Sequence, residues 1–585
     1  MKTKYMTHFG WLRMVTKAEI NKSPKRTLLS DVVAVVFLLA LAGVLYFPQV
    51  TRLGLGLDAF LATYFEQTGY SREPSRPFLE VGWHLATALT GGSVTGYNVF
   101  MFSCLLFSAV LVYFLVRIVL PRQPVWALLA STLKLTWSAN FEVFDNSGLS
   151  IYFSEMLFLF SLSILILLVN HHRKLSQVGV FFASTAMIAS LVVVVGTYQT
   201  FWPLIIFVPL GLIILGVIDR RDRRTLLTLS LWYLASLPMM IWSVHLASKK
   251  IAKLGLSLAE YFDRLYTGFW AATGQSLIVP FSSTPTYTTF GVSVWVVSCI
   301  CIFAVLLVYM GGQSWPALRE QSHKQITRLF ARMSLISAAV VVMTLLPPVL
   351  INLPNYGTRV MHVPALGSIM WVVTVLAGLY WMHRAVGGGL SAIIAIILVA
   401  VMVQQTYNVG NHYAINGYLS RRFWEDVSLE IPNIEEETVV LMDEPPPGIV
   451  AYDGFSTWVL RAITGTQKTF FITSSKPTFD PNSESYKITS VVDISGKVKR
   501  YPGEAYYLRD RVFPGILTKP KTFEVSASRV ISAKWDSSTL RLSVLPERSA
   551  MDLLHKEVPS SYGQVLFPKS SIESNRARKS NSAPL

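Results

Sequence analysis

Charged side chains are scarce in this sequence. They make up 15% of its 585 residues, whereas hydrophobic residues make up 52%, and the mean hydropathy is +0.45. Ordinary soluble domains carry about 25% charged residues, so this composition excludes a conventional soluble protein. Apolar runs recur along the first 410 positions, and most of them reach the roughly 17–25 residues that a helix needs to cross a bilayer. The sequence therefore predicts a polytopic membrane protein.

Cysteine is also rare, and no nucleotide-binding glycine loop is recognisable. The three cysteines, Cys104, Cys299 and Cys301, all lie inside apolar runs. There they predict small buried side chains rather than a disulfide framework or a metal site. The glycines at 387–389 form a short turn between two apolar runs, which is not the pattern of a loop that cradles phosphates.

The net charge of +17 is not arranged like that of a nucleic-acid-binding surface. Such a surface concentrates its basic residues on one soluble face, whereas the region after Asn411 is roughly balanced in charge. Basic residues gather instead in the N-terminal leader and in the short segments 171–174, 219–224, 319–332 and 383–384. Clusters beside apolar runs mark the cytoplasmic side of membrane spans, so no nucleic-acid partner is expected.

Eleven membrane spans are predicted from the apolar runs. The first follows a long basic leader and lacks a small-residue cleavage site, which is typical of a span and not of a secretory signal peptide. Alternation from a cytoplasmic N-terminus places every strongly basic short loop inside and everything after Asn408 outside. A bacterial inner (plasma) membrane is the simplest location. The spans are expected near 28–47, 97–117, 124–139, 148–169, 178–197, 201–218, 225–245, 289–310, 334–351, 361–381 and 389–406.

Four regions follow from this topology. A cytoplasmic tail (1–27) precedes a transmembrane domain (28–410) whose first outer loop (48–96) is long, and an extracytoplasmic domain (411–560) is followed by a disordered tail (561–585). Apolar residues at helical spacing over 78–89 and within 249–287 predict two helices that lie in the membrane interface. In the third region, alternating segments at 438–442, 468–472, 491–494 and 540–544 predict strands and 457–463 a short helix, so a soluble α/β or mostly β domain is expected.

Three polar residues stand at the expected outer ends of spans. Asp58 follows the first span, Asp145 lies between the third and fourth, and Arg359 begins the tenth. Around the last, the sequence reads Tyr356-Gly-Thr-Arg359-Val-Met-His362-Val-Pro364. This set resembles the GT-C class of membrane glycosyltransferases, of the dolichyl- or undecaprenyl-phosphate mannosyl- and aminoarabinosyltransferase type. The resemblance covers about 400 residues in architecture but only a few in motif.

The resemblance implies a fold, a reaction and a donor. Members of the class take a sugar from a polyprenyl-phosphate carrier, use an acidic residue in the first outer loop, and hold the lipid phosphate with the arginine of an Arg-x-x-x-x-Pro motif. Here Arg359 and Pro364 match that motif. Many members carry two adjacent acids in the first loop, whereas Asp58 is followed by Ala59. Either Glu66 or Glu73 is the second acid, or one acid suffices, and a requirement for a divalent cation (Mg²⁺ or Mn²⁺) is left open.

Each residue also has a physical interpretation with an alternative. Asp58 is a candidate general base, worth typically ~10²–10⁴-fold in rate; the alternative is a helix cap or a solvated loop residue. Arg359 offers a planar fork of donors for a phosphate, or it anchors a helix end in the headgroup region. Asp145 positions the acceptor or binds a divalent cation together with Asp58, or else its Asp-Asn-Ser-Gly string forms a turn and an N-cap.

The remaining candidates are predicted to bind substrate. Lys134 and Glu155 lie in neighbouring antiparallel spans, where an unpaired charge costs about 2.5–3.5 kcal/mol. They are expected to pair inside the bundle, either near the phosphate or as a purely structural ion pair. Gln199 lines a sugar pocket or belongs to a tight hairpin. The others flank the motif or the first outer loop: Tyr356, His362, Arg76 and His84, the last two holding the interfacial helix against the site.

The leading interpretation is an inverting glycosyltransferase that moves a sugar from a polyprenyl-phosphate donor to an extracytoplasmic glycan, lipid or protein. The absence of a nucleotide-sugar site favours such a lipid-linked donor. A surface-polysaccharide polymerase or ligase is the alternative enzyme, although those families more often keep their large polar region in a late internal loop. A polytopic transporter is the third alternative. It is disfavoured because no related halves and few mid-span polar groups are visible.

Overall fold

The computed structural model describes two compact units. The helical unit comprises Met1–Val50, Pro74–Leu85 and Asn98–His412, and the C-terminal unit comprises Thr51–Glu73, Ala86–Tyr97 and Tyr413–Leu585. At some helix ends, including Gln199 and Arg359, the backbone alone is described. The described residues are 24–53, 77–120, 123–144, 148–171, 175–218, 222–251, 257–278, 293–319, 323–350, 358–382, 386–431, 434–443, 453–464, 469–473, 478–492, 516–536 and 538–544.

Each of the eleven predicted spans contains a helix. Among the described residues, nine helices are long and apolar enough to cross a membrane. The other two, α6 and α9, have 13 residues each. The prediction of a polytopic helical membrane protein is confirmed, with two of the eleven helices shorter than a full span. The helices are α2 (Pro24–Leu45), α5 (Val94–Val119), α6 (Pro124–Thr136), α7 (Leu149–His171), α8 (Gln177–Thr197), α9 (Trp202–Ile214), α10 (Arg223–Ile251), α13 (Val294–Arg319), α14 (His323–Leu350), α15 (Thr358–Met382) and α16 (Val386–Glu430).

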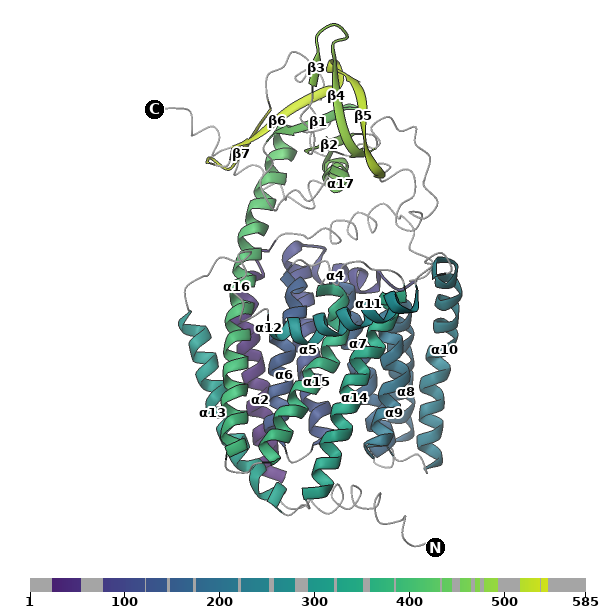
Figure 1. Ribbon diagram of the computed structural model, residues 1–585, viewed down its shortest axis with the longest axis vertical. Coiled ribbons are helices and arrows are strands. Elements are labelled where there is room, and N and C mark those ends of the chain that lie inside the picture. Colours follow the sequence, from purple (N-terminus) through teal and green to yellow (C-terminus); the bar gives the residue numbers. More distant parts are fainter. Residues whose placement is uncertain are drawn as a thin grey trace. The chain divides into compact units, whose positions relative to one another are not determined.

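Short helices join the long ones. Both interfacial segments expected from the sequence are helical, as α4 (Val81–Thr90) and α11 (Leu258–Trp270). Ser257 and Glu260 form a capping box that begins α11, and this helix runs across the long helices rather than along them (Figure 1). The remaining short elements of this unit are η1 (Phe47–Gln49), η2 (Ser138–Phe144), η4 (Gln199–Phe201), the π-helical η5 (Ala271–Gln275) and α12 (Ser276–Ile278).

Helices α14 and α15 approach each other closely at Gly367. A Cβ atom at this position would lie 2.9 Å from the backbone oxygen of Ser337 and 2.8 Å from Cγ2 of Val341. Because a backbone atom cannot move aside, we expect Gly367→Ala to destabilise the protein by ~1–3 kcal/mol. Thermal unfolding in detergent measures this loss. Gly378→Ala on the same helix is the control, since no described atom lies within 4 Å of that position; equal melting temperatures for the two variants would contradict the close approach.

The C-terminal unit contains two sheets. One has the order β2-β1-β6-β7, in which β1 pairs in parallel with β2 and β6 while β7 is antiparallel to β6. The other has the antiparallel order β3-β4-β5. The elements are β1 (Val439–Asp443), α17 (Asp453–Thr464), β2 (Phe470–Ile472), β3 (Thr478–Asp480), β4 (Ser485–Val492), β5 (Ile516–Ser526), η7 (Ala527–Arg529), β6 (Val530–Asp536) and β7 (Arg541–Val544). The short helix and the strands predicted at 438–442, 468–472 and 540–544 are present. Of the strand expected at 491–494, residues 491 and 492 are described and end β4. The domain is of the α/β kind.

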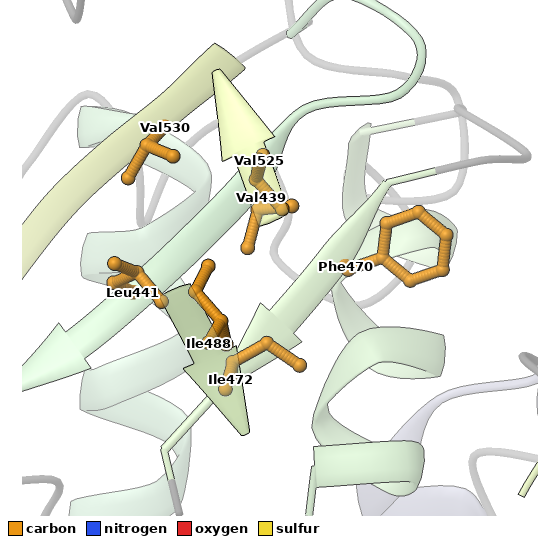
Figure 2. Close-up of a cluster of buried hydrophobic side chains, with 7 residues drawn as sticks. All are labelled: Val439, Leu441, Phe470, Ile472, Ile488, Val525 and Val530. Atoms are coloured by element: carbon orange, nitrogen blue, oxygen red, sulfur yellow. The ribbon is translucent and has the colours of Figure 1, made fainter. Parts of the chain in front are cut away.

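An apolar cluster of described residues joins the two sheets. Figure 2 shows side chains from β1, β2 and β6 of the first sheet meeting side chains from β4 and β5 of the second. Strand residues that alternate in direction place every second side chain in this core. The cluster consists of Val439, Leu441, Phe470, Ile472, Ile488, Val525 and Val530.

Helix α16 begins at Val386, so the glycines at 387–389 are helical and do not form the turn expected from the sequence. The helix continues to Glu430, well beyond the apolar run expected near 389–406. Its last turns are part of the C-terminal unit because Phe423 and Trp424 are buried there. The ring of Phe423 lies 5.3 Å from that of Trp535, and the ring of Trp424 lies 5.7 Å from that of Phe471. The expected domain start at residue 411 therefore falls inside a continuous helix.

Candidate functional site

Three ionisable side chains meet in the interior of the helical unit. Lys134 Nζ lies 2.8 Å from Glu155 Oε2, and His362 Nε2 lies 2.7 Å from the same oxygen. The exposed fractions of the three side chains are 1%, 0% and 2%, respectively. We call these residues the Glu155 cluster. They come from three different helices, so tertiary packing and not local sequence brings them together.

Each member of the Glu155 cluster lies near a helix end. Lys134 is in the last turn of α6, Glu155 in the second turn of α7, and His362 in the first turns of α15. Because α6 ends where α7 and α15 begin, the cluster lies near one end of the helical unit rather than at its middle. All thirteen side chains of α6 are buried. Lys134 therefore cannot reach solvent and needs a partner within the unit.

Two neutral side chains hold the cluster in place. Lys134 Nζ donates to Asn140 Oδ1 over 3.3 Å, and Asn140 Nδ2 donates back to the backbone oxygen of Lys134. The hydroxyl of Tyr152 donates to the backbone oxygen of Asn140 over 2.8 Å. The Tyr152 ring meets the His362 ring edge-on, with 4.4 Å between ring centroids. These contacts orient both the lysine and the histidine toward Glu155.

The charges of the cluster compensate one another. A buried charge without a partner costs several kcal/mol, and here the ammonium of Lys134 neutralises the carboxylate of Glu155. The cluster is neutral when His362 is an imidazole and carries one positive charge when it is an imidazolium. Glu155 Oε1 accepts no hydrogen bond from the described residues. This oxygen therefore keeps the capacity to accept a bond from water or from a bound hydroxyl.

The end of the first span lies beside this cluster. The hydroxyl of Tyr46, just after α2, donates to the backbone oxygen of Leu135, the residue next to Lys134. The Tyr46 ring also lies 5.1 Å from the ring of Phe102 and 5.5 Å from the ring of Phe144. The chain that leads to Asp58 thus leaves α2 at the same end of the helical unit as the Glu155 cluster.

The later part of the first outer loop is attached to the same end. The backbone N–H of Phe78 donates to the oxygen of Gly196 over 3.1 Å, and Thr197 Oγ1 donates to the oxygen of Phe78 over 3.1 Å. Ser150 Oγ, at the start of α7, donates to the oxygen of Leu79 over 2.7 Å. A Cβ atom on Gly196 would lie 2.3 Å from the Phe78 ring, so only glycine permits this approach.

The other predicted site residues are described to different extents. His84 pairs with Glu80 one turn earlier, Nε2 to Oε2 3.7 Å, and its side chain is 42% exposed. Arg359 is placed by its backbone in the first turn of α15, three residues before His362, and Gln199 by its backbone in η4. The residues Asp58, Arg76, Asp145 and Tyr356 lie outside the described residues.

The two candidate metal ligands, Asp58 and Asp145, lie outside the described residues. Within the described part of the chain, no group of three or more His, Cys, Asp or Glu side chains is arranged to hold a metal ion. A cation site made of Asp58 and Asp145 stays a prediction.

Lys134, Glu155 and His362 were predicted from the sequence as candidate site residues, whereas their supporting residues Asn140 and Tyr152 were not. Asn140 follows Lys134 by six positions and Tyr152 precedes Glu155 by three. A tyrosine one turn from a charged residue in an apolar helix is a signal for Tyr152, because positions three apart share a helix face. No local signal points to Asn140, whose contact with Lys134 depends on the turn through η2.

No protein-family model matches the chain, and no curated protein matches it. Among solved structures, the chain is similar to ArnT from Cupriavidus metallidurans in the apo state, with 14% identity and a TM-score of 0.32 over 70% of this chain and 82% of that one. It is also similar to ArnT from the same organism bound to undecaprenyl phosphate, with 16% identity and a TM-score of 0.31 over 70% of this chain and 83% of that one. These scores denote a likeness over part of the fold, so the function proposed below rests on the chain's own residues.

Proposed function

We propose that this multi-pass membrane protein is a glycosyltransferase of the GT-C type, which moves a sugar from a polyprenyl-phosphate donor to an extracytoplasmic acceptor. The observation that carries the proposal is the buried Glu155 cluster, located at the start of the helix that carries Arg359. Buried ionisable groups in membrane helices mark functional sites by default. The sequence resemblance around Arg359 and Pro364 supplies the reaction class.

The first turns of α15 are suited to hold a lipid phosphate. Arg359 and His362 are three positions apart, so they share one face of the helix. A phosphate gripped by the Arg359 guanidinium would lie near the N-terminal end of α15, where the helix dipole also favours negative charge. The Glu155 cluster fixes this face through the bond between His362 and Glu155. Tyr356 and Lys134 are proposed to complete the binding of the donor.

The proposed reaction is a displacement at the anomeric carbon with inversion. An acceptor hydroxyl forms the new glycosidic bond, the bond from the anomeric carbon to the phosphate oxygen breaks, and polyprenyl phosphate leaves with the electron pair. The carboxylate of Asp58 takes the hydroxyl proton as general base. Asp145 is proposed to position the acceptor or to bind a divalent cation together with Asp58. Gln199, Arg76 and His84 are proposed to line or support the sugar pocket.

The charge of the connecting segments supports an outer location for this site. Basic sequences follow the far ends of α7 and α15, at 172–174 and 383–385, opposite to the ends that carry the Glu155 cluster. The positive-inside rule assigns those basic ends to the cytoplasm. The Glu155 cluster then faces the periplasmic or extracellular side of a bacterial inner membrane. The C-terminal unit is proposed to lie on that side and to select the acceptor.

Native mass spectrometry of the purified protein tests the lipid partner. Wild type is expected to retain a polyprenyl phosphate, and Arg359→Ala to lose most of it, because the planar fork of donors on the phosphate is removed. Arg332→Ala is the matched control: it removes an exposed arginine from α14 and is expected to leave lipid binding unchanged.

Three outcomes of this measurement would contradict the proposal in whole or in part. Absence of the lipid from wild type, even after the carrier is added, would favour a transporter or a scaffold. Retention of a polyprenyl diphosphate in preference to the monophosphate would favour a surface-polysaccharide polymerase or ligase. Equal lipid binding in wild type and Arg359→Ala would remove Arg359 from the site.

A further inference from the structure

Arg421 on α16 holds the chain where it enters the loop that carries Asp58. Its Nη2 atom donates to the backbone oxygen of Thr51 over 3.3 Å and to that of Leu53 over 3.1 Å. Leu53 is fully buried, and it lies five residues before Asp58. We propose that Arg421 is a positioning residue for the transfer reaction, which it serves by fixing the first residues of the loop that carries the general base. The inference rests on the function proposed above.

The contact joins one charged side chain to two backbone carbonyl groups, at N···O distances of 3.3 and 3.1 Å. A hydrogen bond from a guanidinium to a carbonyl is charge-assisted, and the pair of bonds fixes the backbone direction at both residues. The same arginine nitrogen donates to two carbonyl groups that are two residues apart, and this requires a turn in the backbone between them. Residues 51 and 52 form the turn that this requires. Arg421 therefore fixes the backbone at Thr51 and Leu53, which precede Asp58 in the sequence.

Arg421 is itself held firmly. On the same segment of α16, the next residue, Arg422, donates through Nε to the backbone oxygen of Leu540 over 3.0 Å. The carboxylate of Asp426 accepts from the backbone N–H of Leu542 over 3.1 Å. These bonds fix the end of α16 to β7 in the C-terminal unit, so the guanidinium of Arg421 is presented from a packed helix and not from a mobile arm.

The residues just before Thr51 are fixed independently within the helical unit. Asn98 Nδ2 donates to the backbone oxygen of Val50 over 2.8 Å, and Asn98 is fully buried. Gln49 Nε2 donates to Asn411 Oδ1 over 3.1 Å. Polar side chains thus hold the chain from Gln49 to Leu53 at nearly every residue. A loop that only connects two helices does not require such attachment, because most loops are mobile and variable in sequence.

The inference gives the C-terminal unit a second role. A general base must lie within hydrogen-bond reach of the proton that it takes, and a misplacement of about 1 Å can lower a rate ~10²-fold. Since Arg421 belongs to the C-terminal unit together with Thr51 and Leu53, correct folding of that unit is needed to place the loop. Acceptor selection and base placement would then depend on the same unit.

Two measurements on Arg421→Gln test the inference. We expect kcat for sugar transfer to fall about 10- to 100-fold, while the retention of polyprenyl phosphate and KM for the donor stay near the wild-type values. Hydrogen–deuterium exchange of peptides that span residues 46–60 is expected to become faster. Arg421→Lys should recover part of both properties, because an ammonium also carries several donors.

Arg529→Gln is the control, since it removes an arginine charge from the same unit but breaks only the exposed pair with Glu437. It is expected to leave exchange over residues 46–60 and kcat near the wild-type values. Unchanged exchange and unchanged kcat in Arg421→Gln would overturn the inference. A wild type that transfers no sugar would overturn the proposed function instead, and the exchange measurement would still decide whether Arg421 holds the loop.

Discussion

Replacement of Asp58 by asparagine is expected to lower kcat for sugar transfer by ~10²–10⁴-fold, the range that a positioned general base contributes. Asparagine keeps the size and the hydrogen-bonding shape of the side chain, but its amide cannot take a proton from the acceptor hydroxyl. The donor does not depend on this proton transfer for binding. Retention of polyprenyl phosphate, measured by native mass spectrometry, should therefore stay at the wild-type level in Asp58→Asn.

The other acids of the first outer loop provide the controls for Asp58. Glu66 and Glu73 lie in the same loop, and if Asp58 alone suffices as the acid of this loop, each tolerates replacement by glutamine with little loss of kcat. Single-turnover transfer from a labelled donor, measured across pH, separates loss of the base from loss of binding. Full activity in Asp58→Asn together with a large loss in Glu66→Gln or Glu73→Gln would move the general base to that residue.

The helices of the fold were largely predictable from the sequence because hydropathy reports burial in lipid directly. The two short helices show where it does not. Helix α9 ends at Ile214 because Gly216 adopts a φ of 78°, and Val217 N–H then bonds to the oxygen of Leu212, a terminator that glycine favours. Helix α6 ends because Trp137 is extended and Asn140 caps the oxygen of Lys134. Hydropathy is averaged over a window of many residues, so it does not detect helix ends that depend on the conformation of one residue.

The last helix shows the opposite error. The last span was expected to end near residue 406, yet α16 runs on to Glu430. The polar side chains are satisfied within the helix and beside it: Gln404 Nε2 donates to Asn408 Oδ1 over 2.9 Å, and Asn411 accepts from Gln49. Buried Trp424 then gives the polar half an apolar core of its own. A hydropathy window ends at the first polar residues, whereas a helix ends where its backbone loses its partners.

The candidate site was predictable in part, for a specific physical reason. Charged residues within membrane helices must pair, and that rule led to Lys134 and Glu155, whose pairing the structure shows. Their role in binding the donor stays a prediction. The bond of His362 to Glu155 was beyond sequence reasoning because the two residues are 207 positions apart. The contacts of Arg421 with Thr51 and Leu53 were missed likewise, because an arginine outside the apolar runs gives no signal of its partner.

Removal of one partner from the Glu155 cluster is expected to cost more stability than removal of two. In Glu155→Leu, Lys134 is left buried beside a hydrocarbon side chain, and such an uncompensated charge costs about 3–5 kcal/mol. In the double variant Lys134→Met, Glu155→Leu, both the ammonium and the carboxylate are removed, and buried ion pairs replaced by apolar residues are often neutral in stability. We therefore expect the double variant to unfold at a higher temperature than Glu155→Leu, with a positive coupling in the double-mutant cycle.

The same pair of variants separates a structural ion pair from a site for the donor. If Lys134 and Glu155 only hold helices α6 and α7 together, the double variant should recover sugar transfer along with stability. If they act on the phosphate, as proposed, the double variant should be stable but transfer sugar poorly and retain less polyprenyl phosphate. Thermal unfolding and native mass spectrometry on one preparation give both quantities. A stable double variant with wild-type transfer would leave the Glu155 cluster a structural feature and would shift the binding of the phosphate to Arg359 alone.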